Sequence, residues 1–317
     1  MKLFITGICG FVGSTLARVC TAANVAAEVF GIDNLSRPGG EANRRILQRE
    51  GIRVIHGDLR NSSDLEGVPA ADWVIDAAAN PSVLAGVDGK TSSRQLVEHN
   101  LLGTVNLLEY CRRARAGFVL LSTSRVYSIP PLATLQVESP NDAFVPAADQ
   151  AFPAGLSPAG VREEFSTAPP VSLYGSTKVT SEHLALEYGA AFDFPVFINR
   201  CGVLAGAGQF GHPAQGIFAY WIHSFREQAP LRYIGFGGHG HQVRDCLHPR
   251  DLVPLLKRQF AEPLHTDKPR TVNVSGGGEN SLSLAQLTRW CGSRFAPRRI
   301  EGSGEQRPFD IPWMVLD

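Results

Sequence analysis

Tyr174 and Lys178 stand four positions apart in a stretch that the following residues predict to be helical. At this spacing two side chains lie one turn apart on the same helix face. A phenol titrates near pH ~10 and is a poor base at neutrality, but an ammonium group beside it favours the phenolate and lowers the pKa. A tyrosine activated in this way can take a proton from a sugar or alcohol hydroxyl. Because this spacing also arises by chance, its meaning depends on the segments before it.

A glycine-rich loop near the N-terminus predicts a dinucleotide site. Gly7, Gly10 and Gly13 lie between an apolar strand at residues 3–6 and a helical run at residues 14–23. Gly7 permits a tight turn, Gly10 lets the backbone approach a pyrophosphate, and Gly13 lets the helix pack on the sheet. The N-terminus of the helix offers free N–H groups and the positive end of its dipole to the phosphates. The alternative is a glycine-rich turn without a ligand.

Acidic residues follow the next two predicted strands, at residues 28–32 and 53–56. Asp33 suits the adenosine ribose hydroxyls, and its charge would repel a 2′-phosphate, which favours NAD over NADP. Arg37 nearby keeps NADP open, and Asp33 could instead be a plain turn residue. Asp58 could accept a hydrogen bond from the adenine amino group or cap the helix that follows it.

Small or hydroxyl-bearing residues follow the fourth and fifth predicted strands, at residues 73–76 and 118–121. Small residues at 77–79 would let a cofactor lie close against the sheet edge. Asn100 in the next helix could anchor the backbone there or be an ordinary core asparagine. Ligands of a doubly wound sheet bind beyond the C-terminal ends of its strands. The cluster after the fifth strand, well placed to meet a bound sugar or else a simple Ser/Thr-rich turn, is Ser122, Thr123, Ser124 and Arg125.

Residues 128–170 are rich in Pro, Ala and Ser and show no clear periodicity. So long a loop is uncommon in a compact domain unless it is functional. Because it lies between Thr123 and Tyr174, we predict a flap that covers the substrate; a disordered linker is the alternative. Residues 195–200 are then predicted to return to the sheet as a strand.

Arg244 and Arg307 are candidates to hold a diphosphate, because a guanidinium binds it bidentately. Each could also form a surface ion pair. Gln215 and the aromatic residues at 218–221 could line a nucleotide base, although aromatics at helical spacing are more often core. His248 has no partners at metal-binding spacing, so we predict a structural histidine and no metal site.

The overall composition argues against several classes of protein. Thirty basic residues balance thirty acidic ones among 317, which gives no indication of nucleic acid or anionic membrane as a partner. The N-terminus runs directly into the first strand without the apolar region of a signal peptide, and no apolar run reaches the ~18 residues of a membrane span. Six scattered cysteines without a Cys-x-x-Cys pair favour a cytoplasmic location.

Together these segments resemble the extended short-chain dehydrogenase/reductase family. The matching motifs, which follow the family's order and cover most of the chain, are Thr6-Gly7-x-x-Gly10-Phe11-x-Gly13, Asp33-Asn34-Leu35, Gly57-Asp58, Asn100-x-x-Gly103-Thr104, Ser122-Thr123-Ser124-Arg125-Val126-Tyr127 and Tyr174-Gly175-x-x-Lys178. The resemblance implies an α/β Rossmann fold, a doubly wound parallel sheet with a smaller C-terminal α/β domain for a nucleotide-diphosphate sugar. We expect the NAD-binding domain at 1–170 with 128–170 as its active-site loop, a return of catalytic helix and strand at 171–200, and mainly substrate binding at 201–317.

The resemblance also implies roles for single residues. Tyr174 would be the acid/base, Lys178 would hold the nicotinamide ribose and depress the tyrosine pKa, and Thr123 would hydrogen-bond the reacting hydroxyl. The expected NAD contacts are Gly7, Gly10, Phe11, Gly13, Asp33, Asn34, Asp58, Leu59, Ala77, Ala79, Asn100, Ser122, Tyr174 and Lys178. The expected substrate contacts are Ser124, Arg125, Gln215, Arg244 and Arg307.

The residues after Thr123 favour epimerisation over water elimination. The family's 4,6-dehydratases usually carry an acid directly after this threonine, whereas Ser124 stands here. Residues 33–37, the long 128–170 segment and residues 242–248 with 280–284 look like the CDP-paratose (CDP-tyvelose) 2-epimerase branch of the family. The alternatives are a UDP-sugar 4-epimerase or dehydrogenase, and a non-catalytic NAD-sensing protein.

The chain also departs from the family pattern. The segment at 201–206 lacks the more polar residues common there, and Ser128 stands where glycine is usual. The chain ends at Asp317, where relatives usually continue, so we expect a truncated or unusual C-terminus. Relatives are commonly homodimers through paired helices, which here would lie near 92–113 and 174–190.

Overall fold

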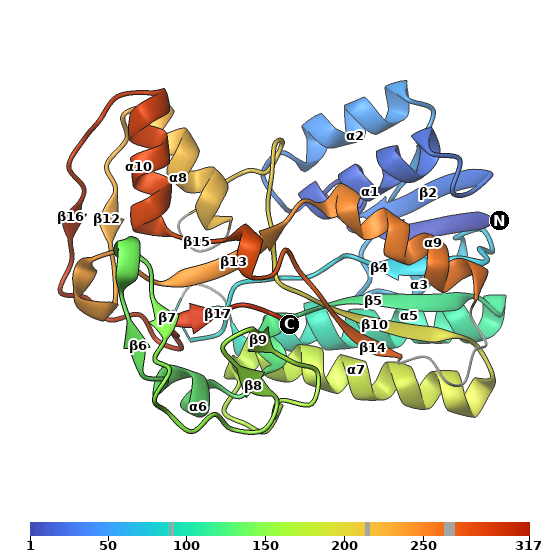
Figure 1. Ribbon diagram of the computed structural model, residues 1–317. Helices are drawn as coiled ribbons and strands as arrows, with labels where there is room; N and C mark the ends of the chain where they lie inside the picture. Colours follow the sequence, from blue (N-terminus) through green and yellow to red (C-terminus); the bar gives the residue numbers. More distant parts are fainter. Residues whose placement is uncertain (88, 90–91, 213–215, 263–269) are drawn as a thin grey trace.

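A seven-stranded parallel sheet forms the centre of the protein in the computed structural model, which describes residues 1–87, 89, 92–212, 216–262 and 270–317 (Figure 1). The strand order is β14-β10-β5-β4-β1-β2-β3. The order changes direction between β1 and β4, which creates a crevice beyond the C-terminal ends of these two strands. The strands are β1 (Lys2–Thr6), β2 (Glu28–Asp33), β3 (Arg53–His56), β4 (Trp73–Asp76), β5 (Gly117–Thr123), β10 (Val196–Cys201) and β14 (Thr271–Val274).

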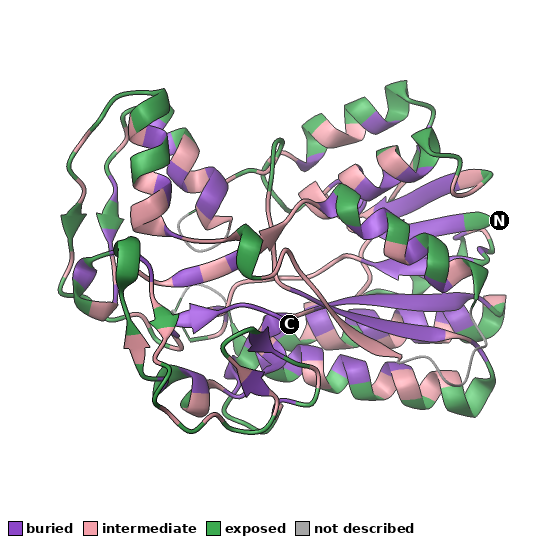
Figure 2. Cartoon of the chain, in the orientation of Figure 1, coloured by how far each residue is buried: buried purple, intermediate pink, exposed green. Residues whose placement is uncertain are grey.

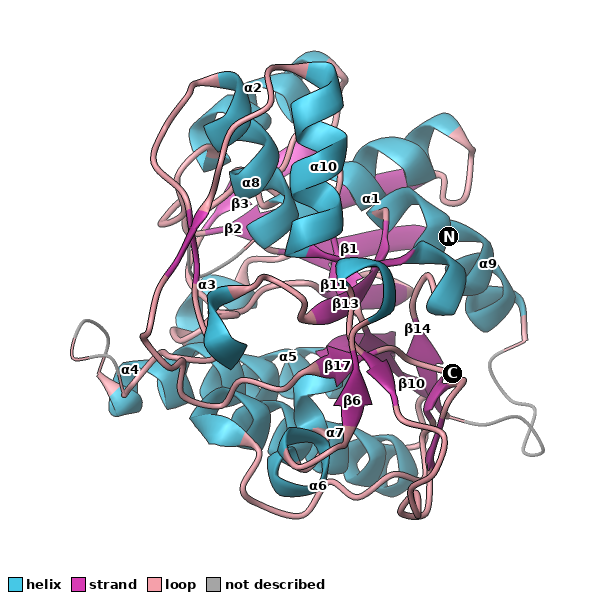
Figure 3. Cartoon of the chain, turned by 60° about the vertical axis from the view of Figure 1, so that its left-hand side comes forward, coloured by secondary structure: helices cyan, strands magenta, loops and turns pink. Residues whose placement is uncertain are grey.

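Helices cover both faces of this sheet, so its central strands are apolar along their length. On one face lie α1 (Phe11–Ala22), α2 (Gly40–Arg49) and α9 (Val253–Ala261), which share an apolar cluster with β1 and β4. On the other lie α3 (Ser62–Glu66), α4 (Ser93–Val97), the π-helical turn η1 (Glu98–Leu102), α5 (Gly103–Ala114) and α7 (Ser172–Phe192). Figure 3 shows α1 and α9 on one side of the sheet, with α5 and α7 on the other. The doubly wound α/β fold is confirmed.

A smaller group of elements lies beyond the C-terminal ends of the central strands (Figure 1). It comprises α8 (Ile217–Arg226), α10 (Leu284–Arg294), the sheet of β11 (Val203–Leu204), β13 (Val243–Leu247), β15 (Ser281–Ser283) and β17 (Trp313–Met314), and the pair β12 (Arg232–Tyr233) and β16 (Glu301–Gly302). Between these in sequence, α9 and β14 return to the central sheet. The region from residue 201 onward is therefore mainly, but not wholly, separate from the central sheet.

The segment 128–170 is ordered, so the alternative of a disordered linker is wrong. It contains α6 (Ile129–Ala133) and the two-residue strands β6 (Val137–Glu138), β7 (Val145–Pro146), β8 (Leu156–Ser157) and β9 (Gly160–Val161). Leu132 and Val161 pack with Trp313 and Leu316 in one apolar cluster. The Asp317 N–H donates to Val161 at 3.0 Å, so the C-terminal residues lie along β9. Residues 311–316, which precede Asp317, are buried (Figure 2).

The described helices include none with the length and apolar character that a membrane crossing requires.

A buried ion pair fixes α7 to the sheet. Glu182 of α7 and Arg200 of β10 lie 2.7 Å apart, with side chains 3% and 11% exposed. The Ser122 hydroxyl donates to the same carboxylate. Arg200 also donates to the Glu163 carbonyl at 3.1 Å and stacks on the Tyr127 ring at 5.2 Å. The pair therefore joins β5, β10, α7 and the 128–170 segment.

Glu182→Gln should lower the free energy of unfolding by about 3–5 kcal/mol, because it leaves Arg200 buried without a counter-charge. Urea denaturation measures this change. The control is Glu50→Gln, which breaks an ion pair with Arg18 whose side chains are 37% and 52% exposed and should cost less than about 1 kcal/mol. Equal losses in the two variants would contradict the role of the buried pair.

Candidate active site

The crevice between β1 and β4 is lined by the glycine loop and the small residues after β4. A Cβ atom added to Gly7 would lie 3.0 Å from the Ala78 Cα, and one added to Gly13 would lie 2.2 Å from the Gly7 oxygen. The Thr6 hydroxyl donates to Asp76 at 2.7 Å and accepts from the Ala78 N–H at 3.1 Å. The loop thus lies directly against the end of β4, at a spacing that only glycine allows.

Asp33 lies at the edge of the same crevice. Its carboxylate accepts from the Cys9 N–H at 2.9 Å and the Leu35 N–H at 2.8 Å, which ties the glycine loop to the end of β2. Helix α1 begins after Gly10 without a side-chain cap, so its first N–H groups face the crevice uncapped. A backbone cradle, a helix N-terminus and a carboxylate are what a dinucleotide requires, and these residues therefore fit NAD.

Asp58 lies beside Asn34 with its carboxylate engaged by Arg60. Arg60 donates to it at 3.0 Å and 2.7 Å, and Asn34 donates at 3.1 Å. These bonds, above all those from Arg60, hold the pKa of Asp58 well below its usual range. Helix α3 follows Asn61 as its N-cap, so the interpretation of Asp58 as the cap is wrong. Its contact with adenine stays a prediction.

Asn100 lies in the π-helical turn η1. Its contacts fit both interpretations from the sequence, a backbone anchor and a core asparagine. It is buried, and its side chain accepts from the Asn80 N–H at 2.7 Å and donates to the Asn80 carbonyl at 3.0 Å. It also donates to the Thr177 hydroxyl at 3.3 Å, so it ties the loop after β4 to α7. In α5, Asn106 donates to the Leu59 carbonyl at 2.7 Å and fixes the loop after β3.

Tyr174 and Lys178 both lie on the buried face of α7, 6% and 2% exposed, as their spacing predicts. Gly175 allows this face to approach the turn after β5, because a Cβ there would lie 2.4 Å from the Arg125 oxygen. Tyr174 consequently lies close enough to Thr123 for the Thr123 hydroxyl to lower the tyrosine pKa. The Thr123 hydroxyl oxygen also accepts from the Arg125 N–H at 3.2 Å.

Burial and neighbouring charges shift the pKa values of Tyr174 and Lys178. Burial raises the pKa of Tyr174 to about 12, while the bond from Thr123 and the charge of Arg125 act in the opposite direction. Burial lowers the pKa of Lys178, and the carboxylates of Asp76 and Glu182 oppose this shift. The expected lowering of the Tyr174 pKa by Lys178 itself stays a prediction.

Sequence analysis did not identify Asp76 and Glu182 as the counter-charges of Lys178. Glu182 follows Lys178 by four positions, so the spacing that pairs Tyr174 with Lys178 could have revealed it. Asp76 ends β4, and its approach to Lys178 depends on how the sheet orders its strands.

Three arginines gather on the substrate side of Tyr174. Burial and the neighbouring charges of Arg244 and Arg307 lower the pKa of Arg125 to about 10, and Asp310 opposes this effect. Arg244 donates to the Asp310 carboxylate at 3.1 Å, with a side chain 14% exposed. Three cations beside one carboxylate make a site for an anionic group such as a diphosphate.

The other predicted substrate residues have separate outcomes. Ser124 is buried at the start of the turn that carries Arg125. Gln215 lies outside the described residues. Of the aromatic run after it, Phe218 and Trp221 pack in the apolar cluster between α8 and α10, as core residues do.

His248 packs against the glycine loop. Its ring meets the Phe11 ring edge-on, with centroids 6.0 Å apart, and its Nδ1 accepts from the Arg250 N–H at 3.2 Å. These contacts give it a structural role. Among the described residues, no three His, Cys, Asp or Glu side chains are grouped as a metal site would require.

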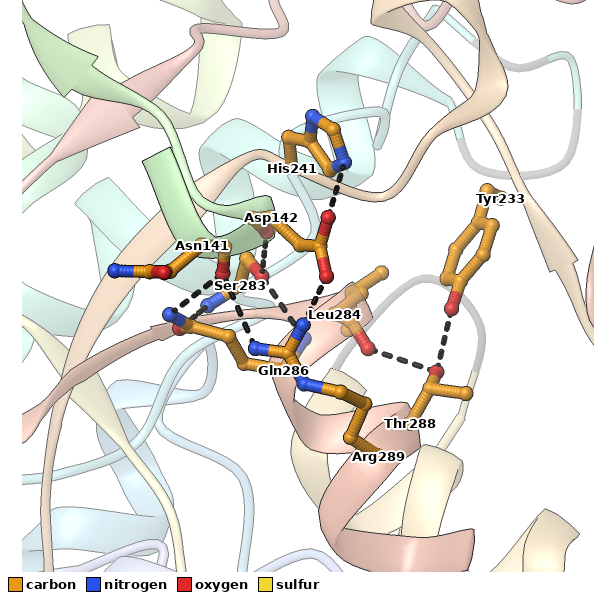
Figure 4. A network of polar contacts seen from close by, with 9 residues as sticks. All are labelled: Asn141, Asp142, Tyr233, His241, Ser283, Leu284, Gln286, Thr288 and Arg289. Atoms are coloured by element: carbon orange, nitrogen blue, oxygen red, sulfur yellow. Dashed lines mark hydrogen bonds and ion pairs between the residues drawn. The ribbon is translucent and has the colours of Figure 1, made fainter. Parts of the chain in front are cut away.

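The 128–170 segment is fastened to α10 at residues 140–142 (Figure 4). Asp142 forms an ion pair with Arg289 and lies 3.8 Å from the His241 Nε2. Ser283, the N-cap of α10, donates to the Asp142 carbonyl at 2.6 Å, and Gln286 donates to the Asn141 carbonyl at 3.3 Å. This clasp holds the segment against the elements that carry Arg244.

Comparisons with known proteins identify the family of this chain and several relatives. A family model described as the NAD dependent epimerase/dehydratase family matches residues 3–275. The chain is 29% identical over 299 residues to a CDP-paratose 2-epimerase of Salmonella typhi, covering 90% of this chain and 82% of that protein. It is 26% identical over 307 residues to a dTDP-glucose 4,6-dehydratase of Streptomyces niveus, covering 92% and 78%.

A solved structure is similar along the whole chain. It is a UDP-glucuronic acid 4-epimerase from Bacillus cereus in complex with UDP-glucuronic acid and NAD. The TM-score is 0.70 at 25% identity, and the match covers 100% of this chain and 90% of that one.

Arg289→Ala should loosen the clasp, because it removes the charge that faces Asp142. Hydrogen exchange of the backbone at residues 140–146 should become faster while exchange in the central sheet stays the same. Arg294→Ala is the matched control, since Arg294 lies in the same helix but stacks on Trp290 at 5.1 Å. Unchanged exchange at 140–146 in Arg289→Ala would show that the ion pair of Arg289 with Asp142 does not hold the segment.

Proposed function

Because the chain belongs to the NAD dependent epimerase/dehydratase family, we propose that this NAD-dependent enzyme epimerises a nucleotide-diphosphate sugar in the manner of a CDP-paratose 2-epimerase. The observation that carries the proposal is the buried position of Tyr174 against the turn that holds Thr123 and Arg125. Tyr174 can act as the acid/base, with Thr123 as its polar partner. Arg125 places a cation where a dehydratase needs an acid.

Tyr174 in its phenolate form removes the proton from the sugar hydroxyl that is oxidised. Thr123 holds the phenol oxygen in place, and Lys178 lies one turn behind it. After the keto-sugar turns its other face, Tyr174 gives the proton back to the same oxygen. NAD, when bound, takes up the hydride and returns it, so no second substrate is consumed.

The surroundings of Tyr174 support epimerisation over dehydration. Water elimination requires a group that protonates the departing hydroxyl. The turn after Thr123 supplies Ser124 and Arg125, and a guanidinium is too weak an acid for this step. The identity with dehydratases is nearly as high as that with the epimerase, so this local chemistry carries the choice.

There are two rival functions. The first is a UDP-sugar 4-epimerase or dehydrogenase, which the similarity to the UDP-glucuronic acid 4-epimerase favours. The second is a binding protein that senses NAD. Incubation with CDP- and UDP-sugars without added NAD separates them. Proton NMR reports which sugar changes and at which carbon. A new epimer without accumulating NADH indicates an epimerase, stoichiometric NADH indicates a dehydrogenase, and binding without any product indicates a sensor.

Tyr174→Phe should keep NAD binding, because the ring still fills its buried position, yet lose on the order of 10²–10⁴-fold in turnover. NAD binding is measured by calorimetry and turnover by NMR with the substrate found above. Turnover equal to that of the unmodified protein would overturn the assignment of the acid/base.

Thr123→Val should shift the rise of turnover with pH to higher pH. Tyr174 must lose its proton to act as base, and Thr123→Val removes the hydroxyl that lowers the Tyr174 pKa, so this pKa rises. The control is Thr123→Ser, which retains the donor and should keep the profile. A profile of Thr123→Val that matches the unmodified protein would contradict the bond's role.

We also propose a homodimer in the cytoplasm, formed through the helices predicted for this contact. Leu102 and Phe192, on η1 and α7, are 41% and 46% exposed and are apolar. These faces bury apolar area when two copies pair. Sedimentation of the purified protein measures the mass of the assembly.

A further inference from the structure

The loop after β11, residues 205–212, meets the cofactor crevice at two points. At its base, a Cβ added to Gly206 would lie 2.2 Å from the His248 Cδ2. His248 in turn packs on Phe11, the first residue of α1, behind the glycine loop. The base of this loop is therefore fixed beside the place where the dinucleotide's phosphates would lie.

At its tip, the loop reaches the opposite edge of the crevice. A Cβ added to Gly39 would lie 2.1 Å from the Phe210 Cε2, so the edge of the Phe210 ring rests on the Gly39 backbone. Gly39 has φ +85° and is the N-cap of α2. The Phe210 side chain is 59% exposed, so only one edge of its ring contacts the Gly39 backbone. Figure 1 shows the loop rising beside the segment before α2.

These two contacts bracket the adenosine end of the crevice. Phe11 belongs to the loop that would cradle the pyrophosphate, and Gly39 ends the segment that begins at Asp33, the ribose candidate. Arg37 in this segment interacts electrostatically with Tyr174, so the segment before α2 also lies near this tyrosine.

The loop is stiffened by its own contacts. The Gln209 side chain donates to the Leu204 carbonyl at 3.1 Å, and its N–H donates to the Gly206 carbonyl at 3.2 Å. A Cβ added to Gly211 would lie 2.1 Å from the Tyr220 nitrogen, so the loop also lies against α8. The contact of Phe210 with Gly39 is the point at which the tip of this stiffened loop meets the segment before α2.

We propose that the contact of Phe210 with Gly39 is a latch that closes the cofactor crevice and retains NAD. Its purpose rests on the proposed function, because an epimerase must hold the reduced cofactor until the hydride returns to the same sugar. Phe210 acts as a positioning residue: it touches the rim of the crevice and none of the reacting atoms.

Phe210→Ala should accelerate NAD release on the order of tenfold, the equivalent of one lost aromatic contact. The protein is loaded with NAD, mixed rapidly with an excess of a competing nucleotide, and followed by its intrinsic fluorescence. Phe295→Ala is the matched control, because Phe295 is 43% exposed at the end of α10, where none of the latch residues lie. It should leave the release rate unchanged.

Gly39→Ala tests the other side of the contact, since its methyl group would displace the ring and strain a left-handed backbone. It should accelerate release to a similar extent. Release from Phe210→Ala at the unmodified rate, or equal acceleration in Phe295→Ala, would overturn the latch. Faster release in a protein that epimerises none of the sugars would leave the latch standing and remove the proposed function. Epimerisation together with an unchanged rate of NAD release from Phe210→Ala would overturn the latch and leave the proposed function standing.

Discussion

The site depends on the burial of one ammonium group. Lys178 is only 2% exposed, and a buried ion without partners costs several kcal/mol. The carboxylates of Asp76 and Glu182 act on it from β4 and from its own helix. Glu182 is shared with Arg200 on β10, so the charge of Lys178 is balanced through three elements of the fold. Helix α7 can hold its position only when the sheet has brought all of these strands together.

The charge network of Lys178, Glu182 and Arg200 also includes the end of β5. Ser122 donates to Glu182, and the next residue, Thr123, lies close enough to Tyr174 to lower its pKa. The end of β5 therefore interacts with α7 at two neighbouring positions.

Much of this architecture could be predicted from local patterns. The glycine loop, the apolar strands and the spacing of Tyr174 and Lys178 each depend on residues close in sequence, and the structure has them as predicted. Asp58 was harder, because its carboxylate binds Arg60 two residues away in a turn that neither helical nor strand periodicity describes. The order in residues 128–170 was also hidden, since its strands are two residues long and its core forms with Trp313, far along the chain.

Long-range contacts of this kind determine how the reaction is enclosed. Asp142 joins Arg289, and Phe210 joins Gly39, each across more than a hundred residues of sequence. In the proposed epimerisation, a keto-sugar intermediate must neither leave nor meet solvent before the hydride returns. Tyr174 and Lys178 lie on one helix, so their spacing can be recognised from a short stretch of sequence. The contacts between these loops join residues far apart in the chain, so local patterns in the sequence do not reveal them.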